Sequence, residues 1–393
     1  MGFFRFLSEY LQTLRVRLSQ NTYENLFCFV NYVPRLLGFS ILKDKIFGSF
    51  YFFLIHFVGL IHKDHREGPL EGLSLTFAHS VSEFIKSYVN ISLFIFVMNN
   101  TNWFLTKRQL LKSTLNEIFE SDRLAIANPI FHQKHEKLVS RVKVILILFF
   151  GFNMMNAFCI YVPHRIVIPN NYAMTPCFGM EPITSSPNHQ ICQVLLFFQE
   201  CSIITIVLSY QSLLLFLIGY TALLYQLLSQ EIMTLNDFDH QAHFNNPVAL
   251  EVLPVLIRRH SILLSIIDKL KSLYSVPIGI DFGSNAVCIC LFFYLPFQEW
   301  LQFSPLLIYC FLVFFLYCFL CQRLTNAAEL FEMSVYSCGW ENFDVKNKKA
   351  VYIMLRQAQK PVKILAAGIV PVNIATFATT LQFMFKFITV VKV

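Results

Sequence analysis

Charged residues are scarce in this chain of 393 residues: Asp, Glu, Lys and Arg make up 14% of it, against 55% hydrophobic residues. A soluble domain carries about a quarter charged residues, so the composition excludes an ordinary soluble protein and predicts a membrane protein. The formal net charge is +7, but the positive residues are scattered between apolar runs. That distribution favours charges that flank membrane spans over a nucleic-acid interface, and we expect no nucleic-acid partner.

Signals of catalysis and of metal binding are also missing. Three His-x-x-His pairs begin at His62, His132 and His240, but none has the Glu of an HExxH motif or a suitably spaced third ligand. There is no Gly-rich phosphate loop and no nucleophile elbow. The sequence therefore predicts a protein that is not an enzyme, with no metal and no cofactor.

The first 20 residues lack the pattern of a cleaved signal peptide. Arg5, Arg15 and Arg17 are mixed with Phe and Leu, which predicts a basic amphipathic helix on the membrane surface, within an N-terminal segment 1–40. Of the 11 cysteines, Cys177 and Cys192 are expected at the outer face with a loop between them. One disulfide and two free thiols are both open interpretations there.

What the chain does contain is a series of long apolar runs. A helix needs about 20 apolar residues to cross a bilayer, and the runs predict an all-α, polytopic membrane protein with seven transmembrane helices. The predicted spans are 41–61, 71–98, 142–163, 191–228, 272–298, 303–327 and 364–391. Several runs continue their helical period beyond the bilayer, so we expect long cytoplasmic extensions that pack together.

The distribution of basic residues predicts the orientation of these spans. Of the 31 Lys and Arg residues, 25 fall at or beyond one set of span ends, four on the other side and two within spans. Cytoplasmic loops carry the excess of Lys and Arg. The N-terminus is therefore predicted to be cytoplasmic and the C-terminus extracellular.

A few ionisable residues fall inside the predicted spans, where each is costly and is a functional candidate by default. Glu83 and Lys86 are three residues apart and can pair on one helix face. Glu200 and Asp281 are isolated acids, and Lys386 lies in the last span. We expect Lys386 to point away from any cation pathway, because a ring of cations would repel permeating cations.

Aromatic and soft side chains crowd the outer halves of the second to sixth spans, with a few polar groups among them. An apolar cavity with a few hydrogen-bonding groups is the usual form of a small-molecule site, although each aromatic alone is typical of helix packing. The predicted pocket residues are Phe77, Ser80, Phe84, Phe152, Met155, Asn156, Phe198, Ser202, Thr205, Phe282 and Tyr309, with Asn285 nearby.

The last 60 residues or so hold a distinctive pattern of aromatic, polar, Gly and Pro residues. It consists of Tyr336, Trp340, Arg356, Gln357, Ala358, Gln359, Lys360, Pro361, Gly368, Pro371, Val372 and Phe377. This pattern resembles the C-terminal signature of insect odorant receptors, and the length, the seven spans and the inverted orientation agree with that family. The segment 230–271 lacks the long insertion expected of the shared co-receptor, so the chain resembles a tuning subunit.

The resemblance implies a ligand-gated, non-selective cation channel in the plasma membrane of olfactory sensory neurons. Its partner would be the odorant co-receptor subunit, in a hetero-oligomer expected to be a tetramer, surrounded by membrane lipid and opened by a small volatile ligand. The implied parts are a ligand-binding bundle at 41–335, a cytoplasmic anchor at 336–363 and a pore-lining helix at 364–393. Residues implied in subunit contact are Tyr336, Trp340, Arg356, Gln359 and Pro361, and those implied in the gate are Val390 and Val393.

Two alternatives stay open. A gustatory receptor channel is favoured by Thr376, Phe377, Gln382 and Phe383, which are similar to the terminal motif of that related family, although the spacing is one residue short and Phe replaces Tyr. A G-protein-coupled receptor would place the N-terminus outside the cell, against the distribution of Lys and Arg.

Overall fold

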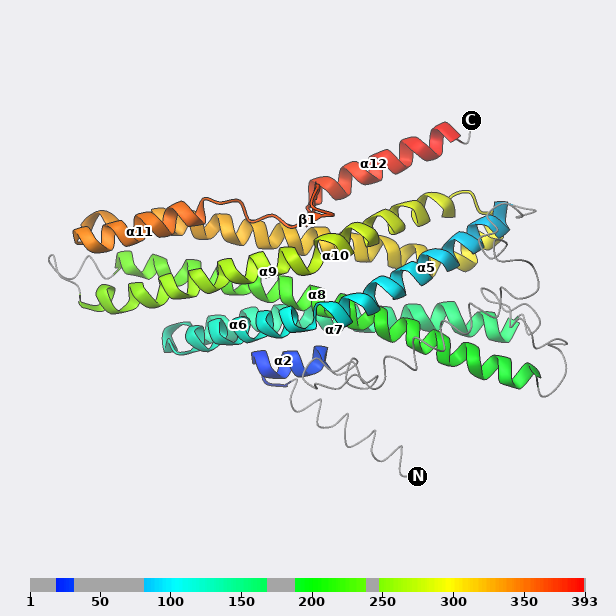
Figure 1. Ribbon diagram of the computed structural model, residues 1–393, viewed down its shortest axis with the longest axis horizontal. Coiled ribbons are helices and arrows are strands. Elements are labelled where there is room, and N and C mark those ends of the chain that lie inside the picture. The colour runs from blue at the N-terminus through cyan, green and yellow to red at the C-terminus, as the bar shows by residue number, and fades with distance from the viewer. Residues whose placement is uncertain (1–18, 32–80, 168–187, 238–246, 392–393) are drawn as a thin grey trace, which may run out of the picture.

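The protein is a bundle of long helices that run roughly along one axis (Figure 1). The computed structural model describes residues 19–31, 81–167, 188–237 and 247–391. The α-helices are α2 (Tyr23–Val30), α5 (Val81–Thr106), α6 (Arg108–Ile126), α7 (His132–Val167), α8 (Asn188–Asp237), α9 (Pro247–Phe292), α10 (Phe297–Tyr336), α11 (Val345–Ala358) and α12 (Ile374–Val391). Two 3₁₀ turns, η2 (Pro129–Phe131) and η4 (Trp340–Asn342), and two short strands, β1 (Leu365–Ala366) and β2 (Val370–Pro371), connect them.

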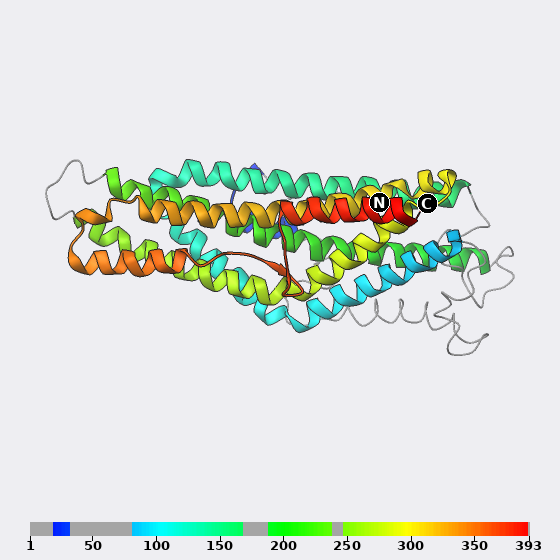
Figure 2. The same cartoon turned by 90° about the horizontal axis from the view of Figure 1, so that it is seen from above.

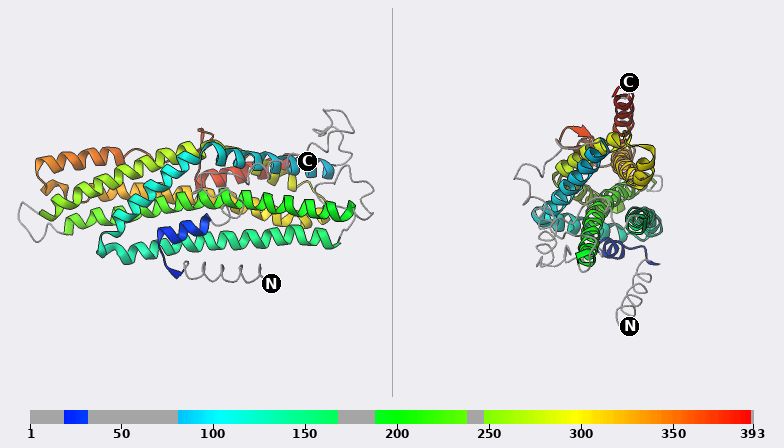
Figure 3. Two further views of the ribbon diagram at one scale, coloured as in Figure 1. Left: turned by 60° about the horizontal axis from the view of Figure 1, so that its bottom comes forward. Right: turned by 90° about the vertical axis from the view of Figure 1, so that its right-hand side faces the viewer.

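Helix α8 forms the centre of the bundle. In its most apolar stretch 83% of the residues are buried, compared with 22% in α7. A helix that is hydrophobic all round belongs in an interior, and α8 packs most extensively against α10 and also contacts α5, α6, α7 and α9. The view from above and the end-on view show the remaining long helices gathered along it (Figures 2 and 3).

Local sequence signals set the ends of several helices. Between α6 and α7, the side chain of Asn128 accepts a hydrogen bond from the N–H of Ile130, and Pro129 stands at the first position of η2. Asp344 caps α11 by accepting from the N–H of Lys346. Such side-chain acceptors satisfy N–H groups that have no partner within the helix. After α10, Gly339 turns the chain at a φ of 75°, a conformation that favours glycine.

The predicted spans compare well with the observed helices where the structure describes them. Four described helical stretches are long and apolar enough to cross a membrane: 129–160, 203–236, 251–292 and 303–342. They contain most of the third to sixth predicted spans and extend beyond them, as the continued helical period predicts. The first predicted span, 41–61, lies outside the described residues, and the second is described from Val81 onward.

The last span is where the sequence-based boundary is wrong. One helix over 364–391 was expected, but residues 365–371 form a two-stranded antiparallel hairpin that pairs Leu365 with Pro371, and α12 begins only at Ile374. Two residues explain the break: Gly368 adopts a φ of 74°, and Pro371 has no N–H to donate to a helix. Helix α12 then leaves the bundle on one side (Figures 1 and 3).

The hairpin is docked on α9. The N–H of Ala367 donates to the carbonyl oxygen of Ser275 at 2.7 Å, one turn before Gly279. A Cβ atom on Gly279 would lie 2.7 Å from the Cβ and 2.8 Å from the backbone nitrogen of Ala367. Only glycine allows such an approach without a shift of the neighbouring backbone, so the hairpin and α9 are in direct backbone contact.

Candidate ligand-binding site

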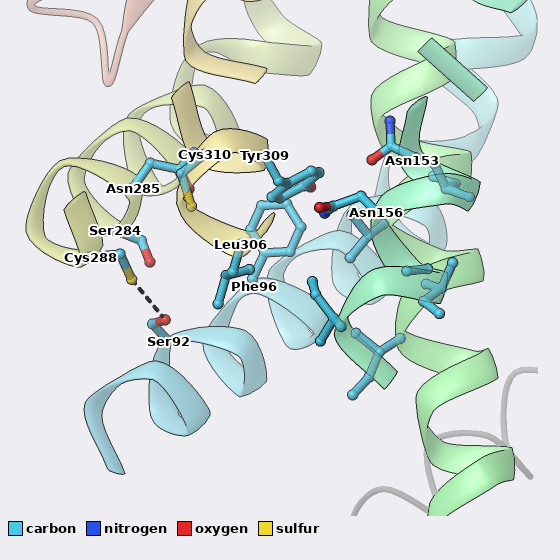
Figure 4. Close-up of a pocket in the computed structure, with 16 residues that line it drawn as sticks. Ser92, Phe96, Asn153, Asn156, Ser284, Asn285, Cys288, Leu306, Tyr309 and Cys310 are labelled. Carbon is cyan, nitrogen blue, oxygen red and sulfur yellow. Dashed lines mark hydrogen bonds between the residues drawn. The ribbon is translucent and has the colours of Figure 1, made fainter. Parts of the chain in front are cut away.

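A small cavity of about 100 Å³ lies among α5, α7, α8, α9 and α10. All five helices contribute side chains to it (Figure 4). Its lining consists of Ser92, Phe96, Asn153, Asn156, Ala157, Ile160, Ile203, Ile204, Val207, Leu208, Ser284, Asn285, Cys288, Leu306, Tyr309 and Cys310. In the predicted orientation, the lining residues of α7, α8 and α10 belong to the outer halves of their spans and those of α9 lie at or near the middle of theirs, whereas Ser92 and Phe96 fall in the inner half of the second span, 71–98.

The cavity wall is mostly apolar and has no charge. Its apolar residues include Phe96, Leu306 and four aliphatic residues of α8 between 203 and 208. No Asp, Glu, Lys, Arg or His is among the lining residues. Because an unpaired charge is costly in an apolar site, the cavity suits a neutral ligand and excludes carboxylates and ammonium ions.

A few polar groups line this cavity at fixed positions. On α7, Asn153 uses its amide N–H to hold the carbonyl oxygen of Phe149 at 2.7 Å. Asn156, one turn later, is 8% exposed and points into the space toward Tyr309 (Figure 4). Its amide has no hydrogen bond to a described residue, so its donor and its acceptor are both available to a ligand.

Two interactions between helices shape the opposite walls. The amide of Gln211 on α8 donates to the hydroxyl oxygen of Tyr309 on α10 at 2.7 Å, which fixes the phenol ring at the cavity. The hydroxyl of Ser92 on α5 and the thiol of Cys288 on α9 are 3.4 Å apart, and either can donate (Figure 4). These pairs connect the cavity wall across four helices.

The structure brings only some of the predicted pocket residues together. Asn156 and Tyr309 line the cavity, whereas Phe152 and Thr205 are half-buried elsewhere and Met155 is 60% exposed. Phe282 packs away from the cavity against Phe314, with ring centroids 4.6 Å apart. The side chains of Phe84, Phe198 and Ser202 are not described, and Phe77 and Ser80 lie outside the described residues.

Several lining residues were not predicted, and a group of them on α9 is small or polar. Ser284, Asn285 and Cys288 share one face of α9, because residues three and four apart lie on the same side of a helix. Of these only Asn285 stood out in the sequence. Small polar residues three and four apart within an apolar span are the sequence signal for these three residues. The prediction relied on aromatic residues instead and therefore missed Ser284 and Cys288.

Helix α12 presents most of its surface outward. Met384 is buried in the hydrophobic core of the bundle, and Phe377 packs on Phe314 and Phe315 of α10 at 5.0 and 5.6 Å between ring centroids. Val390, the predicted gate residue, is 75% exposed, and Lys386 is exposed as well. Val393 lies outside the described residues. The outward face of α12 is therefore open to other molecules.

The predicted subunit anchor is folded against the C-terminal half of α10. Trp340 donates its indole N–H to the carbonyl oxygen of Tyr336 at 3.1 Å. The hydroxyl of Thr325 on α10 holds the carbonyl oxygen of Val362 at 2.9 Å. The side chains of Arg356, Gln359 and Pro361 are exposed.

The possible disulfide lies outside what the structure describes. Cys177 is not among the described residues, and the side chain of Cys192 is not described. Whether the two are bonded therefore stays a prediction.

The chain is similar to a group of known proteins. A family model described as 7tm Odorant receptor matches residues 80–385. Odorant receptor 67a of Drosophila melanogaster is 26% identical over 170 residues, which cover 40% of this chain and 41% of that protein. Odorant receptor 22a of the same organism is 24% identical over 148 residues, which cover 36% of this chain and 37% of that protein. The matched part thus spans about two-fifths of the length of these curated relatives.

The fold is similar to a solved structure over nearly the whole chain. The insect olfactory receptor OR5 from Machilis hrabei superposes with a TM-score of 0.75 at 16% identity, covering 93% of this chain and 97% of that one. The same receptor in complex with eugenol gives a TM-score of 0.75 at 15% identity, covering 92% of this chain and 96% of that one. At this identity the likeness concerns the fold.

Proposed function

Since the chain belongs to the 7tm odorant receptor family, whose model covers residues 80–385, we propose that it is an odorant-binding tuning subunit of a ligand-gated, non-selective cation channel. It acts with the odorant co-receptor in the plasma membrane of olfactory sensory neurons. The observation that carries this proposal is the uncharged cavity among five helices, two of which, α9 and α10, also contact the terminal helix α12.

The cavity is the proposed site for the volatile ligand. Its small volume and apolar wall favour a small neutral molecule, and the amide of Asn156 supplies a hydrogen bond to one polar group. A ligand of about 12 heavy atoms gaining ~0.5 kcal/mol each would bind with an affinity of roughly tens of micromolar. Eugenol, a neutral molecule bound by the OR5 receptor of similar fold, is a suitable first ligand to test.

The proposed route from cavity to pore runs through α9 and α10. Ser284 of α9 and Tyr309 of α10 line the cavity. Further along the same helices, Ser275 of α9 accepts a hydrogen bond from the hairpin, and Phe314 of α10 packs against the ring of Phe377 on α12. A ligand that binds the open state more tightly shifts the equilibrium toward it. Opening would move α12 so that a constriction formed by Val390 from each subunit widens and becomes wet.

The proposed contact with the co-receptor uses the outward face of the anchor. Three apolar side chains of α11 are largely exposed: Val345 at 70%, Tyr352 at 64% and Ile353 at 61%. A contiguous exposed apolar surface marks a site of protein association. This face, with the adjacent Tyr336 at 66% exposure, is where the partner subunit would bind.

The experiment that tests the proposal is whole-cell recording from cells that express this chain with and without the odorant co-receptor. Cells are exposed to eugenol and to a panel of neutral volatiles. Current that requires both subunits and a volatile is the expected result. Ligand-evoked current from this chain alone would overturn the dependence on a partner. Absence of current from a surface-expressed pair, across a panel that activates a control receptor, would overturn the channel assignment.

A further inference from the structure

A second and larger hollow of about 500 Å³ lies between α7, α8 and α10. We call it the cytoplasmic groove. Its lining consists of Leu138, Ser140, Arg141, Val142, Val144, Ile145, Leu146, Leu215, Gly219, Ala222, Leu223, Gln226, Phe319, Leu320 and Arg323. It shares no residue with the cavity described above, so it is a separate site.

The inner part of the cytoplasmic groove is apolar. Leu146 and Leu215 form its buried floor, at 0% and 2% exposure, while Val144 on its edge is 48% exposed. Gly219 keeps part of the space open, because a Cβ atom there would meet only the side chain of Val142, at 3.7 Å. The volume lies within the range of about 300–1,000 Å³ that small-molecule sites occupy.

One end of the cytoplasmic groove is basic. Arg141 on α7 and Arg323 on α10 both line it and are exposed. No carboxylate is among the lining residues, and neither arginine forms an ion pair with a described residue. Other cytoplasmic basic residues are paired: Arg258 contacts Glu120, and Lys269 contacts Glu117 at 2.8 Å. The two arginines are thus available to an anion.

The basic end lies at the level where the inner membrane surface is expected. Three predicted spans end here: 142–163 begins one residue after Arg141, 191–228 ends two residues after Gln226, and 303–327 ends four residues after Arg323. The structure places these three residues, from three helices, around one groove. The apolar part then runs from the inner surface into the hydrocarbon, and the arginines lie at the depth of lipid headgroups.

We propose that the cytoplasmic groove binds one anionic phospholipid of the inner leaflet. The phosphate and the acidic headgroup lie between the guanidinium groups of Arg141 and Arg323, and an acyl chain fills the apolar part beside Gly219. Guanidinium groups match phosphate geometry, and anionic lipids attract basic residues at the cytoplasmic surface. A free phosphate would leave the apolar part empty, and a neutral lipid would leave the arginines unpaired.

Binding can be measured by native mass spectrometry of the purified full chain in a neutral detergent. Phosphatidylserine and phosphatidylcholine are added separately, and bound lipid is counted at each concentration. The wild-type chain is expected to bind one phosphatidylserine in preference to phosphatidylcholine. Replacing both arginines, Arg141→Gln with Arg323→Gln, is expected to weaken phosphatidylserine binding about 30-fold, since each basic residue near the surface contributes to attraction.

Two controls distinguish the groove from general charge attraction and from a simple phosphate site. Lys137→Gln with Lys349→Gln removes the same charge from exposed cytoplasmic positions outside the groove and is expected to leave binding unchanged within about twofold. Glycerophosphoserine, which has the headgroup without acyl chains, should not compete. Equal affinity for both lipids in the wild-type chain, unchanged binding in the double arginine variant, or effective competition by glycerophosphoserine would overturn the proposal.

Gly219→Leu gives a second test that keeps both arginines. Its side chain would occupy the apolar part and reduce phosphatidylserine binding without changing the surface charge. If this variant binds the lipid as the wild-type chain does, then the acyl chain is not in the groove. Elution of each variant at the wild-type position in size-exclusion chromatography shows that the fold is retained.

Discussion

The indole N–H of Trp103 on α5 donates a 2.8 Å hydrogen bond to the carbonyl oxygen of Leu273 on α9. Leu273 lies four residues before Pro277, which is inside the same helix. Proline has no N–H, so the carbonyl four residues earlier loses its helical donor. Trp103 supplies that donor from another helix, and its ring stacks on Tyr274 at 5.2 Å between centroids. The hydrogen bond that Pro277 cannot donate within α9 is thus replaced by one from Trp103, which is 170 residues away from Leu273 in the sequence.

Trp103→Phe should destabilise the protein, because it keeps an aromatic ring but leaves the carbonyl of Leu273 buried without a donor. The expected loss is about 1–3 kcal/mol in the free energy of unfolding. It can be measured as a lower unfolding temperature of the purified chain in detergent. Trp300→Phe is the control, since Trp300 is half-buried near the N-terminal end of α10. Equal unfolding temperatures for the two variants would contradict this role of Trp103.

Asn156→Leu should reduce the response to odorants that carry a hydrogen-bonding group while sparing pure hydrocarbons. The substitution removes the buried amide and retains a similar volume. A neutral hydrogen bond contributes about 0.5–1.5 kcal/mol, so the half-maximal concentration should rise by roughly 2- to 12-fold. Dose–response currents with the co-receptor measure it. Met155→Leu is the matched control, since Met155 is 60% exposed, and a similar shift in both variants would place the ligand elsewhere.

Gly279→Ala should reduce the maximal ligand-evoked current. Its Cβ would be 2.8 Å from the backbone nitrogen of Ala367, so the hairpin must move away from α9 and lose its hydrogen bond to Ser275. Gly283→Ala lies four residues further along the same helix, where an added Cβ meets no atom within 4 Å. Surface labelling confirms equal expression before currents are compared. Indistinguishable currents for the two variants would show that the hairpin contact does not contribute to opening.

Asp281→Asn should raise the unfolding temperature. Asp281 is fully buried in α9, and neither carboxylate oxygen has a hydrogen-bond partner among the described residues. Tyr210 and Tyr317 lie within electrostatic range but carry no positive charge. A buried carboxylate without a counter-charge opposes folding, and the amide has a similar shape without the charge. A lower unfolding temperature would mean that the carboxylate binds a cation or water in the native protein.

Hydropathy predicted which segments form long apolar helices better than it predicted the rotation of each helix. The third to sixth spans and their long extensions agree with α7 to α10, because length and composition determine which segments can cross a bilayer. Successive residues of a helix point about 100° apart. Of two neighbours in the sequence, one can therefore face the lipid while the other faces the cavity. Met155 and Asn156 show this: both were predicted in the pocket, and only Asn156 lines it.

The remaining errors have local causes. The hairpin before α12 was missed because its residues are as apolar as a span, and only Gly368 and Pro371 mark the break. Phe282 was assigned to the pocket by its aromatic character, but it packs against other aromatic rings of the core. Contacts between helices far apart in sequence, such as that of Ser92 with Cys288, leave no signal in a single sequence.

The central position of α8 has a consequence for how the protein is made. Helices of a membrane protein enter the bilayer before they associate, and α8 is synthesised before α9 and α10. Its polar residues Ser209, Gln211, Ser212 and Thr221 are all buried in the finished bundle. They therefore enter the membrane before the surfaces that cover them exist. Gln211 finds its hydrogen-bond partner, Tyr309, only on α10, so we expect a newly made chain that stops short of α10 to be recognised by quality control.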